Sequence, residues 1–132
     1  MRITAETNVL VRALTGDDLL QSRMAQAELA AAEGIALALP ALCELVWVLA
    51  RGYKIPTAEI ARAVRRLIGT ENVAVNRPAA EAGLAMLEAG GDFADGVIAF
   101  EGAWLGGEAF VSFDRRAVEL LEARGLAARS LG

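Results

Sequence analysis

Four acidic side chains occur in settings that favour chemistry. Glu6 follows a short β-prone run near the N-terminus, and Asp114 follows the run Phe110–Phe113. Glu44 and Asp95 lie within strongly apolar segments. In open α/β sheets, the ligand crevice lies at the carboxyl ends of the strands. Carboxylates that converge there without a basic partner indicate a site for a divalent cation.

The sequence contains no histidine and a single cysteine, Cys43. Nucleophile systems that depend on histidine, such as Ser-His-Asp and Cys-His arrangements, are therefore excluded. Zinc sites built from histidine or from several cysteines are excluded for the same reason. If the chain catalyses a hydrolysis, carboxylates and a hard cation such as Mg²⁺ or Mn²⁺ must carry it.

Each acid also has a purely structural interpretation. Asp92 and Asp114 lie where helices are expected to begin, so a helix cap explains either one. Glu44 and Asp95 would be costly to bury unless each is paired or bound to a cation, and an arginine such as Arg12 is a candidate partner. The joint placement of the acids at strand ends and in first helical turns favours a metal site over these separate explanations.

Apolar periodicity predicts an alternation of strands and helices. The expected strands are Arg2–Ala5, Ile35–Leu39, Asn72–Val75, Ala109–Ser112 and Ala127–Leu131. The expected helices are Thr7–Leu14, Asp17–Ala32, Pro40–Ala50, Thr57–Ile68, Pro78–Ala89, Asp92–Leu105 and Asp114–Ala123. Short strands separated by helices predict an α/β fold, with a mostly parallel sheet of four to five strands and helices on both faces.

Polar residues at the expected helix starts predict the caps. Thr7 and Asn8 are expected to cap the first helix and Thr57 the fourth, because their side-chain oxygens can accept hydrogen bonds from free N–H groups of the first turn. Asp17 and Asp18 suit the start of the second helix, where the helix dipole favours negative charge.

The composition fits one globular domain spanning residues 1–132. The chain is long enough for a substantial core, and its hydrophobic share of 55% excludes disorder. No apolar run reaches the roughly 18–20 residues that a membrane span requires. No signal-peptide pattern precedes the first strand, and a lone cysteine fits a reducing compartment. These features predict a cytoplasmic protein that does not bind membranes.

Arginines near the acids are candidates to meet phosphate. Arg115 and Arg116 flank Asp114, and Arg12 lies in the first expected helix, where it could neutralise a carboxylate or a phosphate. The formal net charge of −4 argues against broad affinity for nucleic acid. Bound cations would, however, offset several of the negative charges.

The order of these motifs resembles that of a known family. The run Glu6–Arg12, followed by Thr15–Asp18, resembles the start of PIN-domain ribonucleases of the VapC toxin type. Glu44 in its apolar helix, Gly91–Ala99 and Phe110–Asp114 match later motifs of that family in order and spacing. The resemblance covers essentially the whole chain.

The resemblance implies a PIN-like α/β/α sandwich and an RNA endonuclease that depends on Mg²⁺ or Mn²⁺, the toxin of a type II toxin–antitoxin system. It also implies an RNA substrate, a homodimer and inhibition by a cognate antitoxin protein. The residues that would hold one or two cations are Glu6, Asp95 and Asp114, with Glu44 as a direct or water-mediated ligand. The residues that would orient these acids are Asn8, Ser112 and Asp92. The candidate RNA contacts are Arg12, Arg115 and Arg116.

One residue departs from the family pattern, because Glu6 stands where the family has aspartate. The extra methylene moves the carboxylate by about 1 Å or more, and misplacement on that scale can cost around 10²-fold in rate. Glu6 is explained equally by a natural variant, a weakened toxin or an introduced substitution.

Two other classes of function are open at this point. A catalytically silent PIN-like module would bind RNA or a protein without cutting, and Glu6 is the feature that favours it. A phosphotransferase, such as a receiver domain or a haloacid-dehalogenase-like phosphatase, would need a nucleophilic aspartate after the first strand and a supporting lysine. The sequence offers Glu6 and a single lysine, Lys54, after the Glu44 helix, so it argues against this class.

Overall fold

The computed structural model describes all 132 residues and divides into two compact units. The first unit spans Met1–Asn76 and the second spans Arg77–Gly132. Both combine helices with short parallel strands, so the α/β class predicted from the sequence is confirmed. A single domain spanning the whole chain stays a prediction, and the two units are described in turn.

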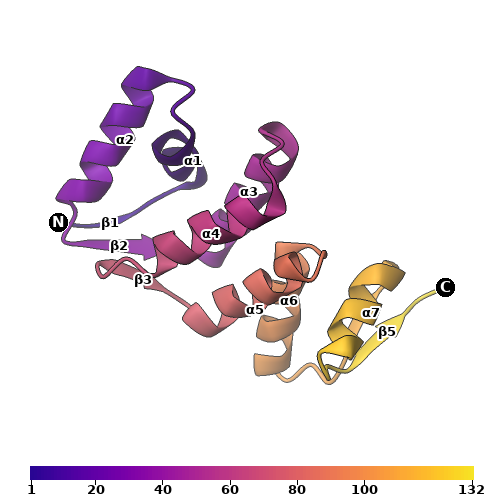
Figure 1. Ribbon diagram of the computed structural model, residues 1–132. Coiled ribbons are helices and arrows are strands. Elements are labelled where there is room, and N and C mark those ends of the chain that lie inside the picture. The colour runs from indigo at the N-terminus through magenta and orange to yellow at the C-terminus, as the bar shows by residue number, and fades with distance from the viewer. The chain divides into compact units, whose positions relative to one another are not determined.

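The first unit is built on a three-stranded parallel sheet with the order β1-β2-β3. Figure 1 shows these strands side by side. Ile35 in the middle strand aligns with Ile3 on one side and Val73 on the other. The elements of this unit are β1 (Arg2–Thr4), α1 (Thr7–Thr15), α2 (Leu19–Ala31), β2 (Gly34–Leu37), α3 (Leu39–Trp47), the π-helical turn η1 (Val48–Gly52), α4 (Thr57–Ile68) and β3 (Val73–Val75).

Apolar side chains at helical spacing bury the inner faces of these helices. Leu42, Leu45 and Leu49 recur every three or four residues through α3 and η1, and each is at most 2% exposed. Ile60 and Val64 do the same on α4. This spacing places the side chains on one stripe of each helix, which explains why α3 and α4 can pack while their other faces stay polar or exposed.

The second unit joins a helical hairpin to a two-stranded parallel sheet. Its elements are α5 (Arg77–Glu88), α6 (Phe93–Trp104), β4 (Phe110–Ser112), α7 (Arg115–Ala123) and β5 (Ala128–Ser130). Gly90 ends α5 with a φ of 96°, a left-handed conformation that glycine adopts without steric cost. Met86, Ala117 and Leu121 form a buried cluster between the hairpin and α7. The chain therefore turns at Gly90, and α6 begins at Phe93 and runs back along α5.

The five predicted strands and seven predicted helices all occur, with ends that differ by one or two residues for most of them. Strands pair in parallel within each unit, and a continuous sheet of four to five strands stays a prediction. The sequence did not indicate η1: the expected helix Pro40–Ala50 ends as α3 at Trp47 and widens into a π-helical turn. None of the helices is long and apolar enough to cross a membrane.

Two of the predicted helix caps are wrong. The residue that caps α1 is Glu6 rather than Thr7 or Asn8, because the Glu6 side chain accepts a hydrogen bond from the Val9 N–H group. Thr57 is the first residue of α4 rather than its cap, and Pro56 precedes it without a side-chain hydrogen bond. Sequence rules favour short polar side chains as helix caps. In both cases the helix begins at a threonine that the sequence predicts as a cap, so the residue before it takes the cap position.

Candidate functional site

Glu6 lies at the junction between β1 and α1, where the sequence places the first metal-ligand candidate. Its backbone is extended, and its Oε1 atom lies 3.2 Å from the Val9 amide nitrogen, which donates to it. The side chain is exposed, and its second carboxylate oxygen has no protein partner. Glu6 therefore caps a helix and still presents one oxygen that is free to bind a ligand.

Glu44 projects from α3 and is linked to the same junction. The Thr7 hydroxyl donates to Glu44 Oε1 at 3.1 Å, so Thr7 connects the start of α1 with α3 across the first unit. The sequence suggested that Glu44 would be a buried carboxylate, but its side chain is exposed on an otherwise apolar helix. The alternative of a buried pair with Arg12 is wrong, because Arg12 pairs with Asp17.

Two aspartates of the second unit cap helices, as the sequence predicts. Asp92 begins α6 and accepts a hydrogen bond from the Ala94 amide at 3.0 Å. Asp114 begins α7, and its Oδ1 atom accepts from the amides of Arg116 and Ala117 at 3.0 and 3.2 Å. Each cap engages one carboxylate oxygen and leaves the other without a protein partner.

Asp95 lies in the first turn of α6 and is half-buried without a cationic partner. Its pKa is raised, first by burial, which penalises the charged form, and then by the negative charges of Asp92 and Asp114. A cation bound beside Asp95 would relieve both causes of the shift.

Nowhere in the chain do three or more acidic or cysteine side chains lie close enough together to hold a metal ion by themselves. Glu6 and Glu44 belong to the first unit, and Asp95 and Asp114 belong to the second. The carboxylates fit a hard cation in their chemistry, since each offers oxygen and none has a basic partner. That all four meet in one pocket stays a prediction.

The predicted orienting residues have different roles. Ser112 lies beside Asp114, and its hydroxyl accepts a hydrogen bond from the Asp114 backbone amide at 2.9 Å. Ser112 thus positions the start of α7 rather than the Asp114 carboxylate. Asn8 is exposed and makes no side-chain hydrogen bond.

The predicted RNA contacts are also distinct from one another. Arg115 donates to the carbonyl oxygen of Gly132 at 3.1 Å, which ties α7 to the end of the chain. The Arg116 side chain is exposed at the start of α7 and has no ion pair. Arg12, in contrast, is held in a dense polar network within the first unit.

A groove of about 660 Å³ is lined by residues of α1 and α2 and by Glu6. Its wall is mainly apolar, and its charged members are Glu6, Arg12 and Glu28. The remaining lining residues are Asn8, Val9, Gln21, Met24, Ala25 and Ala27. Arg12 is therefore the sole cation in a groove that also presents a candidate metal ligand.

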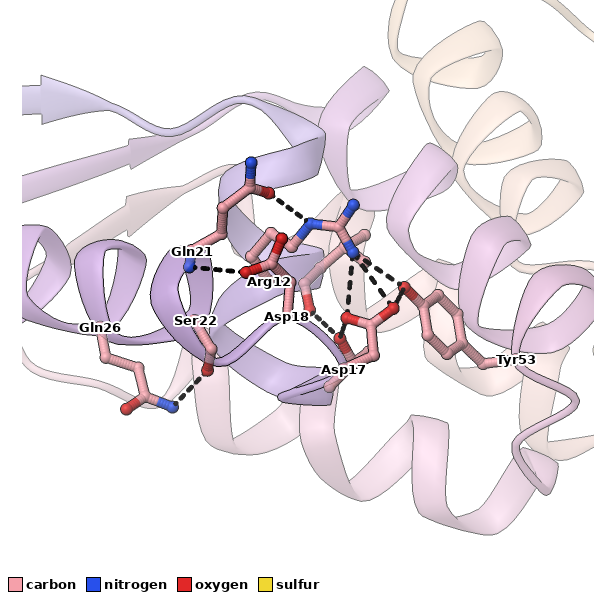
Figure 2. A network of polar contacts seen from close by, with 9 residues as sticks. Arg12, Asp17, Asp18, Gln21, Ser22, Gln26 and Tyr53 are labelled. Atoms are coloured by element: carbon pink, nitrogen blue, oxygen red, sulfur yellow. Dashed lines mark hydrogen bonds and ion pairs between the residues drawn. The ribbon is translucent and has the colours of Figure 1, made fainter.

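Three residues with a part in this region were not predicted as site residues: Thr7, Asp17 and Tyr53. Thr7 orients Glu44, while Asp17 and Tyr53 hold Arg12 (Figure 2). The doubled acid Asp17-Asp18 was a signal that one of the two had a role beyond the helix start, because Asp18 alone provides the cap of α2. Tyr53 had no local signal, since its partners lie far from it in the sequence.

Comparison of the chain with models of known protein families and with curated proteins found no match.

Proposed function

We propose that the protein is a divalent-metal-dependent RNA endonuclease of the PIN-domain type, acting as the toxin of a type II toxin–antitoxin pair. The observation that carries the proposal is Asp95, a half-buried carboxylate with a raised pKa, two acidic neighbours and no cationic partner. Such a group is destabilising in a protein without a bound cation, and it gains from one. The proposal also rests on the motif order of the sequence.

In this function, Glu6, Asp95 and Asp114 hold one or two Mg²⁺ or Mn²⁺ ions. When bound, such a cation polarises a phosphodiester and lowers the pKa of water, which removes the need for a histidine base. Glu44 acts as a direct or water-mediated ligand, and the Thr7 hydroxyl orients its carboxylate. Hydrogen bonds from helix N-termini fix one oxygen each of Glu6 and Asp114, which limits the rotation of both carboxylates.

The partners follow from the same proposal. The substrate is RNA, and Arg115 and Arg116 at the start of α7 are its candidate contacts. A cognate antitoxin inhibits the protein, which acts as a homodimer in the cytoplasm. Glu6, in place of the family aspartate, attenuates the activity because its longer side chain displaces the carboxylate.

The decisive experiment measures cleavage of single-stranded RNA with and without Mn²⁺. The unmodified chain should cut slowly in Mn²⁺ and stop cutting with EDTA. Asp95→Asn should lower the rate of RNA cleavage by about 10²-fold or more, as expected for losing a metal ligand. Glu119→Gln, which removes an equivalent charge from an exposed position on α7, should cut like the unmodified chain.

A second candidate function is a silent PIN-like module that binds RNA or a protein without cutting it. Glu6 favours this alternative, because it departs from the family residue at the metal site. RNA binding without cleavage at any Mn²⁺ concentration would support the silent module. Cleavage that depends on both Mn²⁺ and Asp95 would exclude it.

A further inference from the structure

Arg12 is held by an unusually complete set of polar partners. Its Nε donates to Gln21 Oε1 at 2.8 Å, and its Nη1 lies 3.0 and 3.2 Å from the two carboxylate oxygens of Asp17. The same Nη1 donates to the Tyr53 hydroxyl at 3.3 Å. Figure 2 shows these side chains pointing toward one another from α1, the α1–α2 turn, α2 and the segment after η1.

The partners of Arg12 are themselves fixed. The Tyr53 hydroxyl donates to Asp17 Oδ2 at 2.7 Å, and the Thr15 hydroxyl donates to Asp17 Oδ1 at 2.9 Å. These bonds and the Arg12 charge lower the pKa of Asp17 to about 2, with the Tyr53 hydrogen bond as the largest cause. Asp17 therefore stays ionised, and the guanidinium keeps its orientation, at any physiological pH.

The backbone around Tyr53 is adapted to this contact. The π-helical turn Val48–Gly52 precedes Tyr53, and Lys54 follows it with a φ of 52°, a conformation that residues other than glycine rarely adopt. Wide turns and left-handed residues persist where the surroundings impose them, and they are enriched at functional sites. Here they bring an aromatic hydroxyl to a carboxylate on the α1–α2 turn.

The guanidinium keeps one donor group available. Nε and Nη1 are engaged, whereas Nη2 has no protein partner. Arg12 lines the groove between α1 and α2 and is its only cation, on the same helix that Glu6 caps. A planar guanidinium with free N–H groups matches the oxygens of a phosphate, and its fixed orientation means that little side-chain freedom is lost on binding.

We propose that Asp17, Tyr53 and Gln21 hold Arg12 as a preformed contact for a backbone phosphate of RNA in the groove between α1 and α2. The identity of the ligand as RNA rests on the proposed function. Asp17 and Tyr53 are positioning residues, and Arg12 makes the contact. Because Asp17 balances its charge, Arg12 acts through directed N–H donors more than through net positive charge.

The test is the binding of a fluorescein-labelled, mixed-sequence single-stranded RNA, measured by fluorescence anisotropy in EDTA. Arg12→Gln should weaken binding by about 10-fold, as expected for loss of a charged hydrogen bond. The slope of log affinity against log salt concentration should also become shallower, by up to about 1, the change expected for losing one phosphate contact. Arg12→Lys should recover only part of the affinity, because an ammonium group cannot reproduce the planar donor geometry.

Asp17→Asn separates positioning from simple charge. Removing a negative charge next to the groove should strengthen RNA binding if only net charge matters. If Asp17 positions Arg12, the same variant should weaken binding, by about 3-fold or more. Tyr53→Phe leaves the charge unchanged and should also weaken binding, by about 2- to 5-fold. Tyr53→Phe still tests the proposal if a thermal melt shows that Asp17→Asn is not folded.

Arg23→Gln is the matched control, since Arg23 is exposed on α2 but does not line the groove. It should bind RNA nearly as tightly as the unmodified chain. Unchanged affinity in Arg12→Gln, or tighter binding in Asp17→Asn, would overturn the proposal. Binding is measured without divalent cations, so Arg12-dependent binding without cleavage in Mn²⁺ would overturn the nuclease and retain the phosphate contact. Cleavage in Mn²⁺ together with unchanged RNA affinity in Arg12→Gln would retain the nuclease and overturn the phosphate contact.

Discussion

Glu6 combines two tasks that usually fall to a shorter side chain. It caps α1 through a hydrogen bond to Val9, and it is the first of the proposed metal ligands. Aspartate is among the preferred capping residues and reaches the same amide with fewer rotatable bonds. A change to aspartate is therefore compatible with both tasks.

We predict that Glu6→Asp raises Mn²⁺-dependent RNA cleavage by about 10- to 100-fold, the cost expected for a carboxylate misplaced by an ångström. The free energy of unfolding should change by a few tenths of a kcal/mol at most, because the helix cap is preserved. Initial cleavage rates and a urea titration measure the two effects. Asp95→Asn in the same background should abolish the gain, and equal or lower activity in Glu6→Asp would show that the site is adapted to glutamate.

Asp95 predicts a particular dependence of stability on pH. Since its folded pKa is raised above the ordinary value of 3.8, the folded state binds the proton more tightly than the unfolded state does. Ionised Asp95 therefore lowers stability at neutral pH, and this loss is recovered as the pH falls through the folded pKa toward 3.8.

Asp95→Asn should accordingly raise the Tm of the metal-free protein at pH 7 by about 1–2 °C, a small effect because Asp95 is only partly buried. The difference should vanish in melts below the ordinary carboxyl pKa, where Asp95 is protonated in both states. A lower Tm for Asp95→Asn at pH 7 would contradict the account of its environment.

At the scale of elements, glycines set how closely α5 and α6 approach. A Cβ atom on Gly96 would clash with the Ala82 carbonyl oxygen and lie 2.8 Å from Met86 Cβ. A Cβ atom on Gly83 would lie 2.7–2.9 Å from the ring of Phe93, which is 1% exposed. This close approach fixes the first turn of α6, the turn that carries Asp95.

Gly96→Ala should lower the free energy of unfolding by about 1–3 kcal/mol, because the added methyl group forces the two helices apart. Gly102→Ala on the same helix is the matched control, since a Cβ atom there meets nothing within 4 Å. It should raise stability by about 0.5–1 kcal/mol through helix propensity. Urea denaturation of both variants measures the difference, and equal effects would contradict the packing described for α6.

At the scale of the whole molecule, the proposed metal centre draws on acids that are distant from one another in the sequence. A cation that binds the folded arrangement and not the unfolded chain raises the Tm. If the proposed acids all bind the cation, this stabilisation should depend on each of them.

We predict that Mn²⁺ at about 100 times its Kd raises the Tm by roughly 10 °C. Glu6→Gln and Asp95→Asn should each abolish most of this shift, while Glu119→Gln should retain it. Differential scanning fluorimetry across a Mn²⁺ titration provides the measurement. A shift lost in Asp95→Asn but intact in Glu6→Gln would place the cation in the second unit alone, and no shift at millimolar Mn²⁺ would contradict the metal site.

The sequence by itself determined the features that depend on near neighbours. Apolar spacing located the strands and helices, and Asp18, Asp92 and Asp114 were recognisable at helix starts because a cap bonds to amides two or three residues away. The parallel pairing followed from the alternation of strands and helices.

Only the tertiary structure decided the features that depend on distant partners. Three hydrogen bonds join residues 36 to 41 positions apart: Thr7 to Glu44, Arg12 to Tyr53 and Tyr53 to Asp17. The exposure of Glu44 also depends on the packing around α3. No local pattern encodes them, because the packing of the helices and the widened turn at η1 set these distances. The raised pKa of Asp95 has the same origin, since burial and the approach of Asp114 arise only once the chain has folded.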